Sequence, residues 1–138
     1  MIVRYILDAC ALIALLKDEC GAEEVSAIFN YAFKGEALIF MNKINLLEVY
    51  YDVYRSADKE TADNVVFELV KCPITVVAEI SDAVFTEAGR LKATYKISLA
   101  DSIALAETSV SGGSLVTADH HEFDSIEKRE SIRFHWIR

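Results

Sequence analysis

The chain has 138 residues, of which 53% are hydrophobic, with five glycines and a single proline. A chain of this size buries about two thirds of the surface that it exposes when unfolded. The composition therefore predicts one compact domain over residues 1–138 and excludes disordered and collagen-like proteins. Acidic residues outnumber basic ones by 22 to 14, for a net charge of -8. A generally cationic surface is excluded, so any affinity for nucleic acid must come from a local basic patch.

The predicted elements alternate along the chain between short apolar runs and longer segments of helical periodicity. Strands are predicted at 2–7, 38–42, 74–77 and 114–118, and the apolar segment 132–137 completes the chain. Helices are predicted at 9–17, 22–34, 46–56, 59–71, 82–95, 99–109 and 121–128. Strands that alternate with helical hairpins indicate an α/β fold with a mainly parallel central sheet.

The cysteines and the apolar segments bear on the compartment. Cys10, Cys20 and Cys72 are odd in number and form no CxxC pair, which is typical of reduced thiols, and we expect small buried side chains. The apolar run 9–16 lacks a cleavage site for a signal peptide. No uninterrupted apolar stretch reaches the roughly 18 residues that a membrane span needs. We therefore expect a cytoplasmic protein with no membrane partner.

Four acidic residues stand near the end of a predicted strand or the start of a predicted helix: Asp8, Glu48, Asp101 and Asp119. Each of them could simply cap a helix, because a carboxylate near a helix start accepts backbone N–H bonds and complements the helix dipole. Three of them stand at capping-box or related spacing, in segments 45–48, 98–101 and 119–122. Taken one at a time, the acids favour this structural interpretation.

Taken together, the same acids indicate a ligand site. The carboxyl ends of parallel strands and the helix starts that follow them lie along one edge of a sheet, where α/β proteins bind ligands. Carboxylates that share one crevice repel each other unless a cation occupies it, and hard divalent ions bind oxygen ligands of this kind. Magnesium or manganese held there could orient a phosphodiester and activate water. The pattern therefore predicts hydrolysis of phosphodiester bonds.

Four segments, which together span nearly the whole chain, resemble the acidic motifs of PIN-domain proteins. They are ILDACALIALL (6–16), NLLEVYYD (45–52), ISLADSIALAE (97–107) and LVTADHHEFD (115–124). In length and motif order the chain is similar to the VapC-type toxin ribonucleases of toxin–antitoxin operons. The resemblance implies a PIN-like three-layer α/β/α sandwich and an endoribonuclease that depends on Mg²⁺ or Mn²⁺. It also implies a homodimer, an RNA substrate and a cognate antitoxin protein.

The resemblance further implies roles for individual residues. The metal-binding and catalytic positions of the family match Asp8, Glu48, Asp101 and Asp119. Thr117 matches the hydroxyl residue beside the last acid. Cys10 stands where relatives often carry serine or threonine, and a thiol is a weaker hydrogen-bond donor. Its supporting role is therefore in doubt, and we expect Cys10 to face the core.

Other polar residues are weaker candidates. Arg90, Lys92 and Lys96 form a basic segment without an intervening acid and are candidate RNA contacts, although charge on a helix face is usually only solvated. His120 and His121 do not predict a zinc site, because no second cluster of histidine or cysteine stands at ligand spacing.

Asp52 and Asp124 are two further acids close to the motif acids in the sequence. Asp52, four residues after Glu48, could reach the rim of the site but is interpreted as ordinary surface charge, and Asp124 is interpreted as solvated.

The alternative function is a catalytically inactive PIN-like scaffold or RNA-binding module whose acids are only caps. The presence of all four acids favours the enzyme.

Overall fold

A computed structural model describes residues 2–138, in which five strands alternate with seven helices. The strands are β1 (Val3–Leu7), β2 (Ala37–Asn42), β3 (Thr75–Val77), β4 (Ser114–Thr117) and β5 (Arg133–Trp136). The helices are α1 (Ala9–Leu16), α2 (Ala22–Phe33), α3 (Lys43–Ser56), α4 (Lys59–Leu69), α5 (Asp82–Thr94), α6 (Leu99–Ser111) and α7 (His120–Arg129). Every predicted element is therefore present, with shifts of a few residues at its ends.

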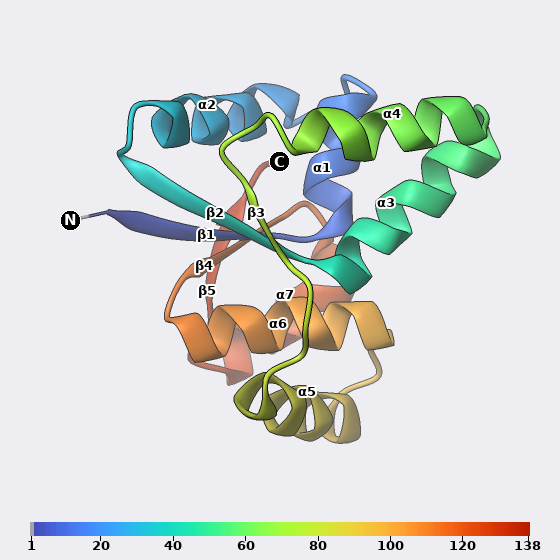
Figure 1. The fold of residues 1–138 in the computed structure, drawn as a ribbon. Helices are drawn as coiled ribbons and strands as arrows, with labels where there is room; N and C mark the ends of the chain where they lie inside the picture. The colour runs from blue at the N-terminus through green and yellow to red at the C-terminus, as the bar shows by residue number, and fades with distance from the viewer. Residues whose placement is uncertain (1) are drawn as a thin grey trace.

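The five strands form one sheet in the order β3-β2-β1-β4-β5, and all four strand pairs are parallel. Helices α1 to α4 lie on one face of the sheet and α5 to α7 on the other (Figure 1). Strand β1 is central because it is apolar on both faces. Ile6 packs into the core beneath α5, α6 and α7, whereas its neighbour Leu7 packs beneath α1 to α4. The predicted three-layer α/β/α architecture is thus confirmed.

The start of helix α3 differs from the sequence-based prediction. The helix begins at Lys43 because the side chain of Asn42, rather than that of Asn45, caps it and accepts the N–H of Ile44 at 2.9 Å. Asn45 is fully buried inside the helix and donates to the carbonyl of Ala100 at 3.0 Å. The capping box predicted at 45–48 is therefore wrong, and Glu48 lies in the second turn of α3.

Within residues 2–138, no helix combines the length and the apolar character that a membrane crossing requires.

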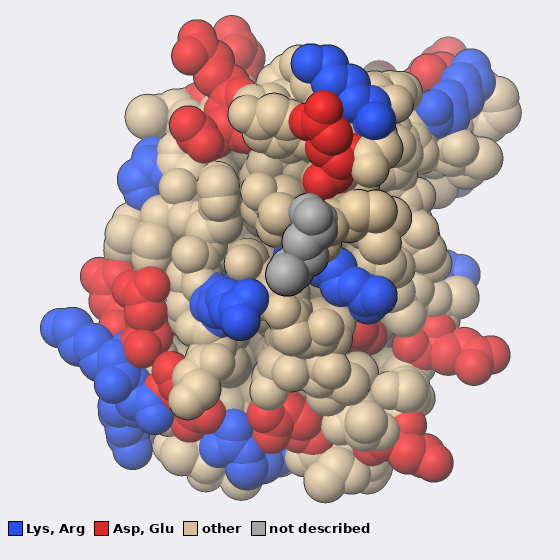
Figure 2. All heavy atoms as spheres, turned by 90° about the vertical axis from the view of Figure 1, so that its left-hand side faces the viewer, with Lys and Arg blue, Asp and Glu red and all other residues tan. Residues whose placement is uncertain are grey.

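The face from which the chain enters β1 has lysine and arginine interspersed with aspartate and glutamate (Figure 2). That face therefore presents no field of a single sign that would steer a charged ligand toward it.

The cysteines are free thiols, as predicted, but none of them is fully buried. Cys10 and Cys72 are partly buried, and Cys20 is exposed. The expectation of three buried side chains is therefore wrong, most clearly for Cys20, which lies in the turn between α1 and α2. The next residue, Gly21, adopts a φ of 101°, which favours glycine.

The carboxamide of Asn42 generates a test of this architecture. Its oxygen caps α3 and its nitrogen donates to the Oε1 of buried Glu107 on α6 at 2.9 Å. We expect Asn42→Ala to lower the free energy of unfolding by about 1–3 kcal/mol, because the helix loses its cap and Glu107 loses its partner. Urea unfolding measures the change, with exposed Asn64→Ala as the control. An equal effect of both substitutions would contradict the assigned role.

Candidate active site

A cavity of about 460 Å³ lies where β1 and β4 end, bordered by α1, α3, α6 and α7. We call it the acidic cavity, because seven carboxylate side chains line it. They are Asp8, Glu19, Glu48, Asp52, Asp101, Asp119 and Glu122. The structure therefore brings together all four acids that the sequence singled out, as the parallel topology predicts.

Asp8 is the most deeply placed of the seven carboxylates. It follows β1 directly, is only 3% exposed, and caps α1 by accepting the N–H of Ala11 at 2.9 Å. Burial raises the pKa of Asp8 to about 7, and the charges of Asp101 and Asp119 contribute in the same direction. Asp8 is therefore both a helix cap and a wall of the acidic cavity, and the two interpretations of the sequence are not exclusive.

Asp101 and Glu48 enter the cavity from helices on opposite faces of the sheet. Asp101 lies in the first turn of α6, and its backbone N–H donates to the Oγ of the N-cap Ser98 at 3.0 Å. Burial raises the pKa of Asp101 to about 6, with contributions from the charges of Asp119 and Glu48. The pKa of Glu48 is also raised by burial, against which a hydrogen bond from Tyr51 lowers it. The two carboxyls therefore influence each other across the cavity.

Thr117 connects the two acids that follow β1 and β4. Its buried hydroxyl makes a hydrogen bond to the Asp8 carboxyl and accepts the backbone N–H of Asp119 at 3.1 Å. Asp119 in turn caps α7 by accepting the N–H of Glu122 at 3.2 Å. The Thr117 hydroxyl therefore lies between the two acids, and its supporting role stays a prediction.

The expectation that Cys10 faces the core is wrong. Cys10 is only partly buried and lines the acidic cavity, because it lies on the side of α1 that turns toward α3 and α7. Burial raises the pKa of the Cys10 thiol to about 11, and the charge of Asp8 contributes. The thiol is therefore protonated at neutral pH and places a weak hydrogen-bond donor, rather than another negative charge, in the cavity.

Sequence reasoning missed part of the α3 surface. Glu48, Tyr51, Asp52 and Arg55 line the acidic cavity as one stripe of the helix, at spacings of three and four residues. The sequence predicts only that Asp52 could reach the rim, with ordinary surface charge favoured, and it predicts nothing of the kind for Tyr51 and Arg55. The signal that could have found them was the i, i+3, i+4, i+7 repeat counted from Glu48.

The weaker sequence candidates lie outside this cavity. Arg90 pairs with Glu87 and Glu130, each at 2.7 Å, and neither Lys92 nor Lys96 is among the described residues that line the cavity. Their contact with RNA stays a prediction. His120 makes a hydrogen bond to Asp124 at 2.8 Å, and its ring stacks on Trp136 with 3.8 Å between centroids. These contacts give His120 a structural role.

The donors fit a hard divalent cation in kind, since all four predicted ligands are carboxylates. Across residues 2–138, however, no three side chains of histidine, cysteine, aspartate or glutamate are arranged closely enough to hold a metal ion. Binding an ion would require the carboxylates around the cavity to draw together. Burial raises the pKa of Asp8 and of Asp101 because it takes their ionised forms out of water. A cation supplied to the cavity would stabilise these ionised forms, and this favours the rearrangement.

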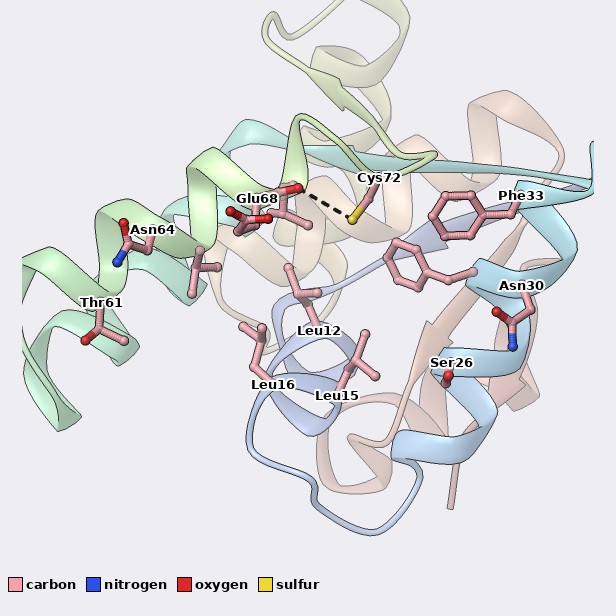
Figure 3. A pocket seen from close by; sticks show the side chains of 13 residues that line it. Leu12, Leu15, Leu16, Ser26, Asn30, Phe33, Thr61, Asn64, Glu68 and Cys72 are labelled. Atoms are coloured by element: carbon pink, nitrogen blue, oxygen red, sulfur yellow. Dashed lines mark hydrogen bonds between the residues drawn. The ribbon is translucent and has the colours of Figure 1, made fainter.

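A second cavity, of about 450 Å³, lies between α1, α2 and α4. Leu12, Leu15 and Leu16 of α1 point into it, with Phe33 from α2 opposite (Figure 3). Among the side chains that line it, only Glu68 is charged. Helix α1 thus separates an apolar cavity from the acidic one, and the groups able to perform chemistry lie on the acidic side.

Comparison with known proteins identifies the fold. The sequence matches the PIN domain family over residues 5–129, and the chain belongs to that family. No significant match was found among curated proteins.

Several solved structures share the fold. A chain of VapBC2 from Rickettsia felis, bound to promoter DNA, has a TM-score of 0.74 at 18% identity and covers 96% of this chain and 98% of its own. A chain of DNA-bound VapBC from Salmonella typhimurium has a TM-score of 0.74 at 16% identity, with coverages of 99% and 100%. The sarcin-ricin loop cleaving toxin VapC20 of Mycobacterium tuberculosis has a TM-score of 0.68 at 10% identity, with coverages of 88% and 94%. At such identities the likeness is one of fold.

The raised pKa values predict how stability depends on pH in the absence of metal. Asp8 and Asp101 bind protons more tightly in the folded chain than in the unfolded chain, where their pKa is near 3.8. Stability should therefore fall as pH rises from about 4 to about 7, because the unfolded chain releases these protons near pH 4 whereas the folded chain holds them up to pH 6 or 7. A one-unit difference in pKa corresponds to about 1.4 kcal/mol, so the loss should reach a few kcal/mol.

Urea unfolding at a series of pH values measures this dependence. Asp101→Asn removes one of the two groups, so the slope of stability against pH should become shallower in that variant. A wild-type stability that rises over this range, or an unchanged slope in the variant, would contradict the assignment.

Proposed function

We propose that the chain is a divalent-metal-dependent endoribonuclease that hydrolyses phosphodiester bonds of RNA. The observation that carries the proposal is the convergence of Asp8, Glu48, Asp101 and Asp119 on one cavity at the carboxyl edge of a parallel sheet. Membership of the PIN family supports it, as does the likeness in fold to VapC20, a toxin that cleaves the sarcin-ricin loop.

The proposed ligands of Mg²⁺ or Mn²⁺ are the same four carboxylates, with Asp8 and Asp101 at the centre of the cavity. When bound, such an ion supplies stabilisation of the negative charge that develops on the phosphate and lowers the pKa of a water ligand. The ion also relieves the repulsion between the carboxylates. We propose that either Mg²⁺ or Mn²⁺ supports the reaction.

The protein contributes rigid positioning of these carboxylates. Thr117 and the N–H of Ala11 hold the Asp8 side chain, and Ser98 fixes the first turn of α6 from which Asp101 projects. Glu48 projects from the second turn of α3, next to Tyr51 on the stripe that lines the cavity. Because these contacts are made by helix starts and strand ends rather than by long loops, drawing the carboxylates together around an ion needs movement of side chains and not the rearrangement of a loop.

The burial of Asp8 argues against the alternative function of an inactive scaffold. Asparagine caps a helix about as well as aspartate and carries no charge that burial would disfavour. A scaffold would therefore be more stable with asparagine at position 8, whereas a nuclease needs the carboxylate. The raised pKa of Asp8 supports a functional reason for keeping the acid.

We further propose that the chain is the toxin of a type II toxin–antitoxin pair and that a cognate antitoxin protein inhibits it. The support is the likeness in fold to chains of VapBC complexes from several bacteria. A cytoplasmic location and a homodimeric state belong to the same proposal.

Cleavage of a structured RNA pool tests the proposed activity. Purified protein, free of any partner, should cut RNA in Mn²⁺ or Mg²⁺ and not in chelator. Asp101→Asn and Asp8→Asn should each lower the rate by about 100-fold or more while keeping the fold, because both lose a metal ligand but keep a polar side chain. Circular dichroism checks the fold.

Asp124→Asn is the matched control, because Asp124 is an exposed acid that binds His120 outside the acidic cavity. It should cut like the wild type. Metal-stimulated cleavage that survives unchanged in both cavity variants would overturn the proposed site, and a wild type that neither binds metal nor cuts RNA would favour the scaffold.

Light scattering tests the proposed homodimer. The chain has a mass of 15.4 kDa, and the purified protein should elute with about twice that mass at micromolar concentration. A mass equal to that of one chain across the concentration range would contradict the homodimer, without bearing on the nuclease.

A further inference from the structure

Arg55 is the one lysine or arginine among the described residues that line the acidic cavity. It lies two turns after Glu48 on the stripe of α3 that faces the cavity, and its side chain is exposed. A guanidinium at the rim of a cavity with seven carboxylates would be expected to form an ion pair. Within residues 2–138 it forms none that meets a distance of 4.0 Å.

The contacts of two neighbouring residues explain why Arg55 is unpaired. Asp52, three residues earlier and well placed for a helical ion pair, binds Lys17 of α1 at 2.8 Å instead. The guanidinium of Arg55 lies over the ring of Tyr51, 5.3 Å from its centroid. Tyr51 itself lines the acidic cavity, three residues after Glu48 on the same stripe of α3. Arg55 thus lies over an aromatic ring of the cavity wall, and no carboxylate among the described residues pairs with its N–H groups.

We propose that Arg55 binds a backbone phosphate of the RNA beside the phosphate that is cut. This inference rests on the proposed nuclease function. A strongly acidic cavity repels the polyanionic RNA. A cation at the rim is therefore needed to hold the strand at phosphates other than the one at the metal site. A planar guanidinium fits this task because it donates two parallel hydrogen bonds to phosphate oxygens. Stacking on Tyr51 reduces the side-chain freedom that binding would otherwise cost.

Binding of uncut RNA tests the role of Arg55 apart from catalysis. In an Asp101→Asn background with Mg²⁺, a fluorescently labelled RNA that the wild type cleaves is titrated at several salt concentrations. Adding Arg55→Ala should weaken binding about 10-fold and reduce the slope of log K against log salt by about 0.7, the value for one phosphate contact on a single strand. Arg55→Lys should keep the slope but bind less tightly, because it loses the bidentate contact.

Arg129→Ala is the matched control. Arg129 is also exposed and lies over a tyrosine, with 4.9 Å to the ring centroid of Tyr95, but it is absent from the lining of the acidic cavity. The Arg129→Ala substitution removes the same charge and the same kind of contact, and it should change neither affinity nor slope.

In cleavage by otherwise wild-type protein, Arg55→Ala should raise KM about 10-fold with a smaller effect on kcat.

The outcomes separate this inference from the function on which it rests. If wild-type protein cuts RNA and Arg55→Ala binds with the same affinity and slope as Arg129→Ala, the assignment of Arg55 is wrong and the nuclease stands. If the wild type does not cut RNA in either metal, the proposed function itself fails. A loss of affinity in Arg55→Ala with no change in slope would also overturn the phosphate contact.

Discussion

Crowding of like charges at the carboxyl edge of the sheet is the constraint on which the rest of this structure depends. Asp8 is almost completely buried, and Asp101 and Asp119 contribute to raising its pKa to about 7. An arrangement of this kind costs stability in the absence of a counter-ion. Two of the acids offset part of this cost, because the side chains of Asp8 and Asp119 cap α1 and α7.

The parallel topology produces this crowding without any dedicated loop. Strands β1 and β4 are neighbours in the sheet, so the residues that follow them, Asp8 and Asp119, meet at one edge. Helices α3 and α6 approach the same edge from opposite faces and add Glu48 and Asp101. Acids separated by more than one hundred residues in the chain therefore share one cavity, and the Thr117 hydroxyl lies between the two that come from the strands.

Much of this arrangement could be predicted from the sequence, because it follows from periodicity and from strand ends. Apolar runs located the first four strands, the apolar segment 132–137 contains the fifth, and the four acids at the ends of elements located the cavity. The start of α3 could not be predicted, because Asn42 and Asn45 are equally good caps by type. Only the tertiary bonds to Glu107 and to the carbonyl of Ala100 decide between them.

The environment of Cys10 and the role of the α3 surface depended on packing in the same way. Cys10 is one turn from buried Ala14 in a helix that is apolar almost throughout, so its sequence context indicates the core. The stripe that places Arg55 near Glu48 follows helical spacing, but its significance appears only when Asp52 is seen to bind Lys17. Helical spacing thus predicted where Cys10 and Arg55 lie along their helices. The contacts between helices decide which of these side chains face the acidic cavity and which of them form ion pairs.

Titration of Mn²⁺ into the purified protein tests the central claim most directly, because the claim is that the crowded carboxylates form a cation site. Calorimetry on wild type, Asp101→Asn and Asp124→Asn should show saturable binding that is weakened at least about 10-fold in the first variant and unchanged in the second. Absence of binding to the wild type, or equal binding by all three proteins, would contradict the account.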